Sequence, residues 1–374
     1  MIDCQLFYDS LTRNGVGFFT GVPDSLLKDI CAYITDHVPA EEHIITPNEG
    51  NAIALATGYH LASKGVPLVY MQNSGFRNCI NPLTSLTDPE VYAIPMVLLV
   101  GWRGETGVKD EPQHVKMGRV NPALLEALEI PYEILPVEAE DALQTVARVV
   151  ALAKEKSAPV ALLVRKDTFS KYKLQKSAQN AIANLKREQA IQEVLKRLPE
   201  NARVVGTTGK ISREVYEYRD IEKTSHDRDF LTVGAMGHAS HIALGLALGQ
   251  PDKLVVCFDG DGAALMHMGG FASAGVYGPE NFRHIIFNNA AHESVGGQPT
   301  VGDQISFTDI AKACGYKSVS RIEKGEELNG QLDAFLKQSG PSLLEIMVEK
   351  GSRDDLIRPK TTPIENKRVL MEAL

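Results

Sequence analysis

The sequence has few cysteines, a single tryptophan and no long apolar run. Its five cysteines form no CxxC pair and no spacing typical of a disulfide framework, and Cys257 falls within an apolar segment. This usage favours a reducing compartment. No uninterrupted apolar run reaches the roughly 20 residues of a membrane-spanning helix. Because residues 1–15 have the pattern of an amphipathic helix rather than of a secretory signal, we expect a soluble cytoplasmic protein.

The sequence also lacks an excess of positive charge. It contains 39 lysines and arginines against 47 aspartates and glutamates, so its formal net charge is −8 at pH 7. This balance argues against a nucleic-acid partner, although local basic groups can still bind an anionic substrate. The 374 residues, of which 44% are hydrophobic, are enough to form two domains with separate cores.

Strand-like segments alternate with helix-like segments in both halves of the chain. The alternation predicts an α/β protein with two doubly wound parallel-sheet domains, at residues 1–166 and 189–374, and no middle domain. The polar segment 167–188 has no strand pattern and is the predicted linker. The predicted strands are VGFFTG, EHIIT, PLVYMQ, IPMVLLVG and APVALLVR in the first half, and ARVVGTT, KLVVCF, RHIIFNN and PSLLEIMV in the second.

The clearest motif is an abrupt DGDG turn after the apolar segment 254–258. A helix is predicted over residues 263–276, directly after this turn. Glycines let a backbone approach a phosphate, and the start of a helix offers free N–H groups to it. The carboxylate of Asp261 would repel a phosphate unless a cation lay between them, and Mg²⁺ prefers oxygen ligands. The turn therefore predicts a site for a diphosphate and a metal ion.

Two asparagines, Asn288 and Asn289, follow the next buried strand. Open parallel sheets place their ligands at the carboxyl ends of the strands. The 25 residues between Gly262 and Asn288 fit one helix and one strand, so the pair should return to the sheet edge that carries Asp261. Asparagine is also a common turn residue, and a capping role for the pair is the simpler alternative.

The GDG turn followed by NN at this spacing resembles the diphosphate and metal motif of thiamine diphosphate enzymes. The resemblance implies that the side chains of Asp261 and Asn289 and the main-chain carbonyl of Ala291 hold Mg²⁺, with Asn288 structural. The segment GTTGKISRE after the first strand of the second half suits a loop near the diphosphate or the substrate. The implied cofactor-binding residues of these loops are Thr208, Gly209, Gly260, Asp261, Gly262, Ala263 and Asn289.

Enzymes of this family also need a glutamate that hydrogen-bonds the aminopyrimidine ring of the cofactor. Glu49 follows a predicted strand and begins an apolar helix, where burial should raise its pKa. A glutamate in a first helical turn can instead simply complement the helix dipole. In the segment LTVGAMGHASH, the resemblance implies that the Gly234 carbonyl accepts the 4′-amino group and that Met236 supports the bent cofactor. Met236 as an ordinary core residue remains the alternative.

Over almost its whole length the chain resembles the phosphonopyruvate decarboxylases, with the sulfopyruvate decarboxylases as near relatives. The matching strings cover residues 71–104, 110–118, 292–300 and 351–360, followed by PIENK. The resemblance implies decarboxylation of 3-phosphonopyruvate to phosphonoacetaldehyde and CO2, a step in phosphonate biosynthesis. It also implies a homo-oligomer whose active sites are shared between subunits. Decarboxylation of sulfopyruvate or of another 2-keto acid is the alternative.

Such a substrate carries a carboxylate and a phosphonate, so its pocket should contain hydrogen-bond donors and positive charge. His114 lies where related decarboxylases place a catalytic histidine, and Ser25 corresponds to a polar position after a GxP turn that contacts substrate in related enzymes. The family's loop reads NSGLGN, and Phe76 and Arg77 occupy its variable pair in this sequence, so Arg77 is either an added phosphonate ligand or a surface residue. For most of these residues a plain loop or capping role is equally open. The remaining substrate candidates are Lys210, His292 and Ser294, with His238 and His241 weaker.

Two other functions fit the sequence less well. An NAD-dependent dehydrogenase would also have a glycine-rich turn after a strand, but DGDGAALMHMGG lacks the GxGxxG spacing. A thiamine diphosphate binder without catalytic activity would be expected to keep the metal motif and to lose Glu49. Both features are present, which favours an enzyme.

Overall fold

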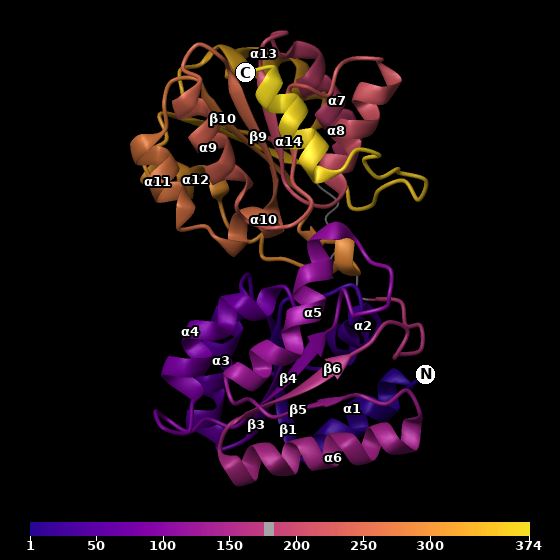
Figure 1. Ribbon diagram of the computed structural model, residues 1–374. Helices are drawn as coiled ribbons and strands as arrows, with labels where there is room; N and C mark the ends of the chain where they lie inside the picture. Colours follow the sequence, from indigo (N-terminus) through magenta and orange to yellow (C-terminus); the bar gives the residue numbers. More distant parts are fainter. Residues whose placement is uncertain (176–182) are drawn as a thin grey trace. The chain divides into compact units, whose positions relative to one another are not determined.

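The computed structural model describes residues 1–175 and 183–374. The chain divides into two compact units, each described here by itself (Figure 1). The first unit comprises Met1–Ser177 together with Ser294–Pro299, and the second comprises Ala178–Glu293 together with Thr300–Leu374. Within the described residues, no helix has the length and apolar character needed to cross a membrane.

The first unit contains a six-stranded parallel sheet in the order β2-β1-β3-β4-β6-β5. One core lies between the sheet and α1, α2 and α6, and a second core lies on the opposite face with residues of α3 and α5. Both faces of the central strands are therefore buried, which explains their continuous apolar runs. The elements are α1 Cys4–Arg13, β1 Val16–Gly21, α2 Lys28–His37, β2 His43–Ile45, α3 Glu49–Ser63, β3 Val66–Gln72, α4 Ile80–Pro82, β4 Met96–Gly101, α5 Pro112–Ala127, β5 Tyr132–Ile134, α6 Ala139–Lys156 and β6 Pro159–Val164.

The second unit repeats this plan with a parallel sheet in the order β13-β14-β10-β9-β7-β8. Residues of α7, α8 and α13 form the core on one face, and residues of α9 to α12 form the core on the other. The elements of the second half of the chain are α7 Arg187–Arg197, β7 Arg203–Gly206, α8 Lys210–Ile221, β8 Asp229–Leu231, α9 Ala239–Gly249, β9 Val255–Gly260, α10 Asp261–Met266, α11 Gly270–Tyr277, β10 Phe282–Asn288, β11 Ala291–His292, β12 Gln298–Pro299, α12 Phe307–Ala313, β13 Ser318–Ile322, α13 Leu328–Lys337, β14 Ser342–Met347 and α14 Pro363–Glu372. Of these, β12 lies in the segment that belongs to the first unit.

The predicted fold class is confirmed, because each unit is a parallel sheet with helices on both faces. Every predicted strand is present. The prediction missed β5, β8 and β13, which are short or half-buried strands at sheet edges, and the two-residue strands β11 and β12, which pair with each other. Such strands lack the apolar run that identifies a central strand.

The helix predicted over 263–276 is wrong as a continuous element. It is interrupted between Met266 and Gly270, and His267 leaves the helical conformation with φ −130° and ψ 46°. A Cβ at Gly270 would lie 2.4 Å from the ring of His241. The chain therefore restarts a separate helix, α11, where a glycine lets it pass close to α9.

The predicted linker 167–188 lies partly outside the described residues, which exclude 176–182. At its start, Phe169 is buried in the first unit, where its ring packs edge-on against Phe7 with centroids 5.0 Å apart. At its end, Arg187 already begins α7 of the second unit. The described ends of this segment are thus parts of the two units.

Two glycines in helices of the second unit provide a test of this packing. A Cβ at Gly275 in α11 would lie 2.1 Å from the carbonyl oxygen of Cys314, whereas Gly330 in α13 is exposed with open space around it. We predict that Gly275→Ala destabilises the protein by about 1–3 kcal/mol through overpacking. Gly330→Ala should instead stabilise it by roughly 0.5–1 kcal/mol, because alanine favours the helix. Thermal unfolding of both variants measures these changes in stability. Unfolding midpoints that shift in the same direction would contradict the close packing of α11.

Candidate active site

The turn after β9 places a fully buried carboxylate at the carboxyl edge of the second sheet. Asp261 is the first residue of α10, and its side chain accepts a hydrogen bond from the hydroxyl of Thr300. Burial raises the pKa of Asp261 to about 6, although Thr300 and the backbone N–H groups of Asn289 and Gly262 act against this rise. The hydrogen bond from Asn289 shows that the GDG turn and the paired asparagines meet, as the spacing predicts.

The two asparagines after β10 have different partners. Asn288 is completely buried, and its amide nitrogen donates to the Gly302 carbonyl and to Glu345, both at 2.7 Å. Its amide oxygen accepts from the N–H of Ala290 at 3.0 Å, so its polar groups serve the fold. The Asn289 side chain instead lies beside the loop that follows, where its oxygen accepts from the Ala291 N–H at 3.1 Å.

The donor set around Asp261 fits a divalent cation. None of the lysines, arginines and histidines in the described chain forms an ion pair with Asp261, and a buried carboxylate without a positive partner is costly. The carboxylate, the Asn289 amide oxygen and the Ala291 carbonyl are the kinds of oxygen ligand that Mg²⁺ takes. The backbone at Gly302 packs closely against Asp261, since a Cβ at Gly302 would lie 2.9 Å from the Asp261 carboxylate.

Two further loops lie beside the GDG turn at the same edge. Because β7 pairs with β9, the loop with Thr208 and Gly209 leaves the strand next to Gly260, and Gly209 has φ +101° before α8 begins at Lys210. The loop before α9 also reaches this turn. The Met236 methyl group would lie 3.5 Å from a Cβ at Gly262.

Other contacts fix this second loop against the start of α10. A Cβ at Gly237 would lie 3.1 Å from the Ala263 carbonyl, and Gly237 itself has φ +83°. Gly234 lies three residues before Gly237, in the stretch that joins β8 to α9. The structure thus brings the predicted cofactor-binding segments 207–210, 234–237, 260–263 and 288–291 to one edge of the second sheet.

Glu49 is the corresponding buried carboxyl of the first unit. It begins α3 after the N-cap residue Asn48, and only 4% of it is exposed. Burial raises the pKa of Glu49, while a hydrogen bond from the Asn78 amide at 2.7 Å acts against this shift. A Cβ at Gly75 would lie 2.0 Å from the Glu49 carboxylate, so only glycine fits beside it. The environment of Glu49 therefore favours the protonated form of its carboxyl group more than water does.

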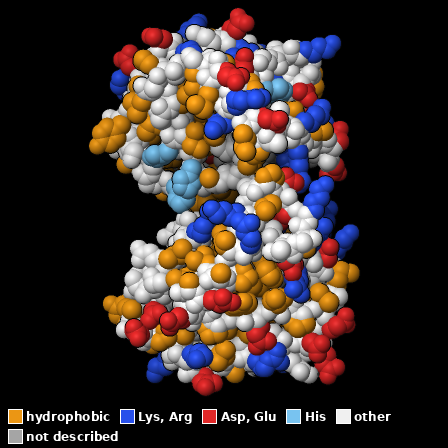
Figure 2. All heavy atoms as spheres, in the orientation of Figure 1, with side chains coloured by type: hydrophobic (Ala, Val, Ile, Leu, Met, Phe, Trp, Pro, Cys, Tyr) orange, Lys and Arg blue, Asp and Glu red, His pale blue; other side chains and the backbone are white. Residues whose placement is uncertain are grey.

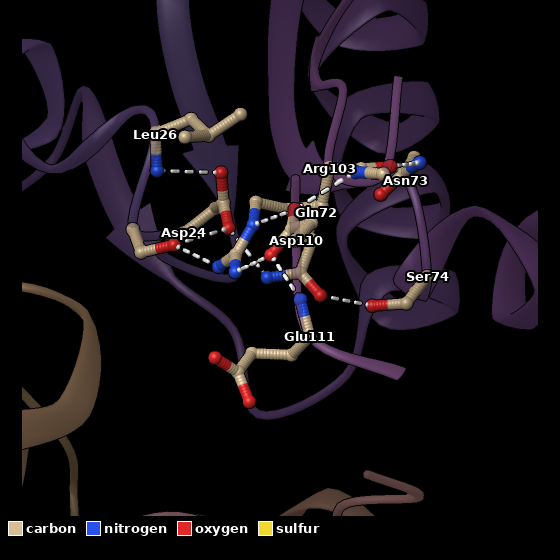
Figure 3. Close-up of polar contacts among 10 residues, drawn as sticks. Asp24, Leu26, Gln72, Asn73, Ser74, Arg103, Asp110 and Glu111 are labelled. Carbon is tan, nitrogen blue, oxygen red and sulfur yellow. Dashed lines mark hydrogen bonds and ion pairs between the residues drawn. The ribbon is translucent and has the colours of Figure 1, made fainter. Parts of the chain in front are cut away.

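Ser25 belongs to a polar network with Asp24 and Arg103 at the same edge of the first sheet. Figure 3 shows the contacts of Asp24, Arg103 and Asp110 in this network. The Ser25 hydroxyl accepts a hydrogen bond from Arg103 at 2.7 Å. Arg103 is held in turn by a bidentate ion pair with Asp110, which lowers the pKa of that carboxyl. The neighbouring Asp24 is fully buried, accepts from Gln72 at 2.6 Å, and has a pKa raised by burial.

The same ion pair fixes the entry to the helix that carries His114. Asp110 accepts hydrogen bonds from the N–H groups of Gly104 and Glu111, and α5 begins two residues later. His114 is buried in the first turn of α5. Arg103, Asp110 and Asp24 are functional-site candidates that the sequence motifs did not predict. Arg103 and Asp24 are charged residues shortly after β4 and β1, a position that could have indicated them, whereas Asp110 lies farther along the loop after β4.

The remaining substrate candidates differ in exposure. His292 is buried, and burial lowers its pKa to about 4, so its ring is neutral at pH 7. Arg77 and Ser294 are exposed, and Arg77 donates to the Ser74 carbonyl at 3.2 Å. Figure 2 shows histidine side chains gathered on one face of the second unit. Among the histidines after β8, His238 and His241 are exposed, and the ring of His238 lies 4.4 Å from that of His267.

A separate buried cluster in the second sheet has its own hydrogen bonds. His284 on β10 lies between Asp259 and the Tyr316 hydroxyl, at 3.4 and 3.2 Å from its two ring nitrogens, with Cys257 nearby. Because both nitrogens have partners in the protein, this cluster is accounted for as part of the core.

Two family models match the chain and follow its division into units. The model described as "Thiamine pyrophosphate enzyme, N-terminal TPP binding domain" matches residues 4–122. The model described as "Thiamine pyrophosphate enzyme, C-terminal TPP binding domain" matches residues 207–346. These ranges contain Glu49 and Asp261, respectively, and they exclude the dehydrogenase alternative.

Three relatives are similar along most or all of the chain. The phosphonopyruvate decarboxylase of Streptomyces viridochromogenes is 35% identical over 379 residues, which cover 98% of this chain and 93% of that protein. The enzyme of the same name from Streptomyces hygroscopicus is 36% identical over 389 residues, with 100% and 94% covered. A sulfopyruvate decarboxylase of Methanosarcina acetivorans is 27% identical over 349 residues, with 87% and 85% covered. The chain therefore belongs to the thiamine pyrophosphate enzymes and, within them, to the phosphonopyruvate decarboxylase family.

Proposed function

We propose that this protein decarboxylates 3-phosphonopyruvate to phosphonoacetaldehyde and CO2 with thiamine diphosphate and Mg²⁺. The observation that carries the proposal is the similarity to two phosphonopyruvate decarboxylases over 98% and 100% of the chain. The buried carboxyl groups of Glu49 and Asp261 support it, because each has the environment that its proposed role requires. The proposed setting is a cytoplasmic step in phosphonate biosynthesis.

The second unit would bind the diphosphate end of the cofactor. Thiamine diphosphate, when bound, supplies a nucleophilic carbon and an electron sink for the loss of CO2 from a 2-keto acid. Asp261, Asn289 and the Ala291 carbonyl would offer oxygen ligands to Mg²⁺, and the backbone at Gly260, Gly262 and Ala263 would approach the phosphates. The orphan charge of Asp261 supports this assignment, since a cation would neutralise it.

The first unit would bind the aminopyrimidine ring of the cofactor and exchange a proton with it. The raised pKa of Glu49 suits a carboxyl that shares a proton with a ring nitrogen. The hydrogen bond from Asn78 holds the carboxyl in one orientation. We assign Glu49 the role of holding and moving a proton at its carboxylate oxygen.

The polar network around Ser25 would face the keto acid. Its hydroxyl is oriented by Arg103, and His114 lies on the helix whose start the Arg103–Asp110 pair fixes. We assign Ser25 and His114 to the substrate's reacting end, and Arg77, Lys210, His292 and Ser294 stay candidates for the phosphonate. Sulfopyruvate is the second candidate substrate, favoured by the similarity to a sulfopyruvate decarboxylase along 87% of the chain.

We predict that Asp261→Ala removes Mg²⁺-dependent binding of thiamine diphosphate, with an affinity loss above roughly 100-fold, because it deletes a metal ligand. Titration calorimetry with both ligands measures the affinity, and circular dichroism checks the fold. Asp252→Ala removes an exposed carboxylate near β9 and serves as the matched control. Unchanged affinity in Asp261→Ala would refute the metal assignment.

We predict that kcat/KM for phosphonopyruvate exceeds that for pyruvate by roughly 100-fold or more. A pocket built for a dianion leaves its donors unpaired when a methyl group takes its place, which costs several kcal/mol. A coupled aldehyde assay on phosphonopyruvate, sulfopyruvate and pyruvate gives the three values. Comparable values for phosphonopyruvate and pyruvate would overturn the proposed specificity, and a preference for sulfopyruvate would select the second candidate.

We also propose a homo-oligomer in which Glu49 of one chain and Asp261 of another serve the same active site. Glu49→Ala and Asp261→Ala chains, each inactive alone, are then mixed and allowed to exchange. About half of the dimers become mixed, and each has one intact site, so activity should recover to about a quarter of wild type. Continued inactivity after mass spectrometry confirms exchange would exclude the shared site.

A further inference from the structure

A buried guanidinium joins the start of α7 to the loop after β10. Arg187 is 5% exposed, and its Nε and Nη2 atoms donate to both oxygens of Glu214 on α8 at 2.8 Å. Its remaining terminal nitrogen, Nη1, donates to Glu293 at 2.7 Å. One arginine thus binds two carboxylates, one on a helix and one at the end of the proposed metal loop.

The same carboxylate of Glu293 binds the proposed metal ligand. Its Oε2 atom accepts a hydrogen bond from the amide nitrogen of Asn289 at 2.6 Å. An ionised carboxylate is only an acceptor, so the nitrogen of the carboxamide must face Glu293. The amide oxygen is thereby turned to the other side, where it meets the N–H of Ala291. The hydrogen bond to Glu293 therefore orients the Asn289 carboxamide so that its oxygen, rather than its nitrogen, can face a cation.

The charges of this cluster do not balance within the described chain. One guanidinium faces Glu214 and Glu293, and the neighbouring Asp261 has no ion pair there. The second oxygen of Glu293, Oε1, is buried without a hydrogen-bond partner among the described residues. A cluster with this excess of negative charge does not stabilise the fold efficiently, because removing charges from water costs free energy. A divalent cation beside Asn289 would offset the excess.

We propose that Arg187 and Glu293 are positioning residues, which hold the Asn289 carboxamide with its oxygen available to the metal ion. The proposal rests on the metal site described under the proposed function. It extends that site to an arginine 106 positions away from Glu293 in the sequence. Partners of this kind that orient a metal ligand typically change metal affinity by roughly 10–100-fold when they are removed.

The test is a Mg²⁺ titration of the full-length protein at fixed thiamine diphosphate, followed by calorimetry. Glu293→Ala should weaken Mg²⁺ binding by roughly 10–100-fold, because the Asn289 amide loses its orientation. It keeps the Arg187–Glu214 pair, so folding is retained. Glu293→Gln should give an intermediate loss, since its amide oxygen can still accept from Asn289. Saturating Mg²⁺ should restore kcat in both variants, a split that a purely structural role would not produce.

Arg353→Met is the control for losing an ion pair that involves α7 and α8, because Arg353 pairs with Glu188 on α7 and Glu217 on α8. It should leave Mg²⁺ affinity unchanged. If Asp261→Ala abolishes Mg²⁺ binding while Glu293→Ala binds as wild type does, the positioning role is refuted and the metal site stands. If Asp261→Ala binds Mg²⁺ normally, the metal site itself fails, and the positioning role fails with it.

Discussion

A buried carboxylate without a cationic partner in the described chain is the constraint on which the second unit depends. Asp261 lies at the end of β9, where burial raises its pKa and the loop after β10 closes over it. Hydrogen bonds from Thr300 and from the backbone of Asn289 reduce this cost without removing it. The surrounding loops therefore enclose the Asp261 carboxylate, whose charge a bound cation would neutralise.

Buried carboxyl groups of both units pack against glycines. Glu49 lies against Gly75, and Asp24 lies against Gly101, with no room for a Cβ at either glycine. Asp261 has the same relation to Gly302. In each case a backbone without a side chain approaches a carboxyl group at the edge of a parallel sheet. Close packing desolvates each of these carboxyl groups, and burial raises the pKa of all three.

The parts of the fold predicted correctly from the sequence are those with strong local patterns. Central strands such as β4 are buried on both faces, and their apolar runs are easily recognised. The short strands β5 and β8 carry no such pattern, because neighbours in the sheet stabilise them. The predicted helix 263–276 breaks for a similar reason, since the contact between Gly270 and His241 on another helix is not visible in the local sequence.

By itself the sequence determined the family, the two-sheet plan and the positions of Glu49, Asp261 and Asn289, because motifs at strand ends depend on short-range spacing. Only the tertiary structure decided the partners of these residues. Arg103 meets Ser25 across 78 positions, and Arg187 meets Glu293 across 106. Such ion pairs and hydrogen bonds form where separate elements pack together, and their geometry follows from the packing of the sheet rather than from distance along the chain.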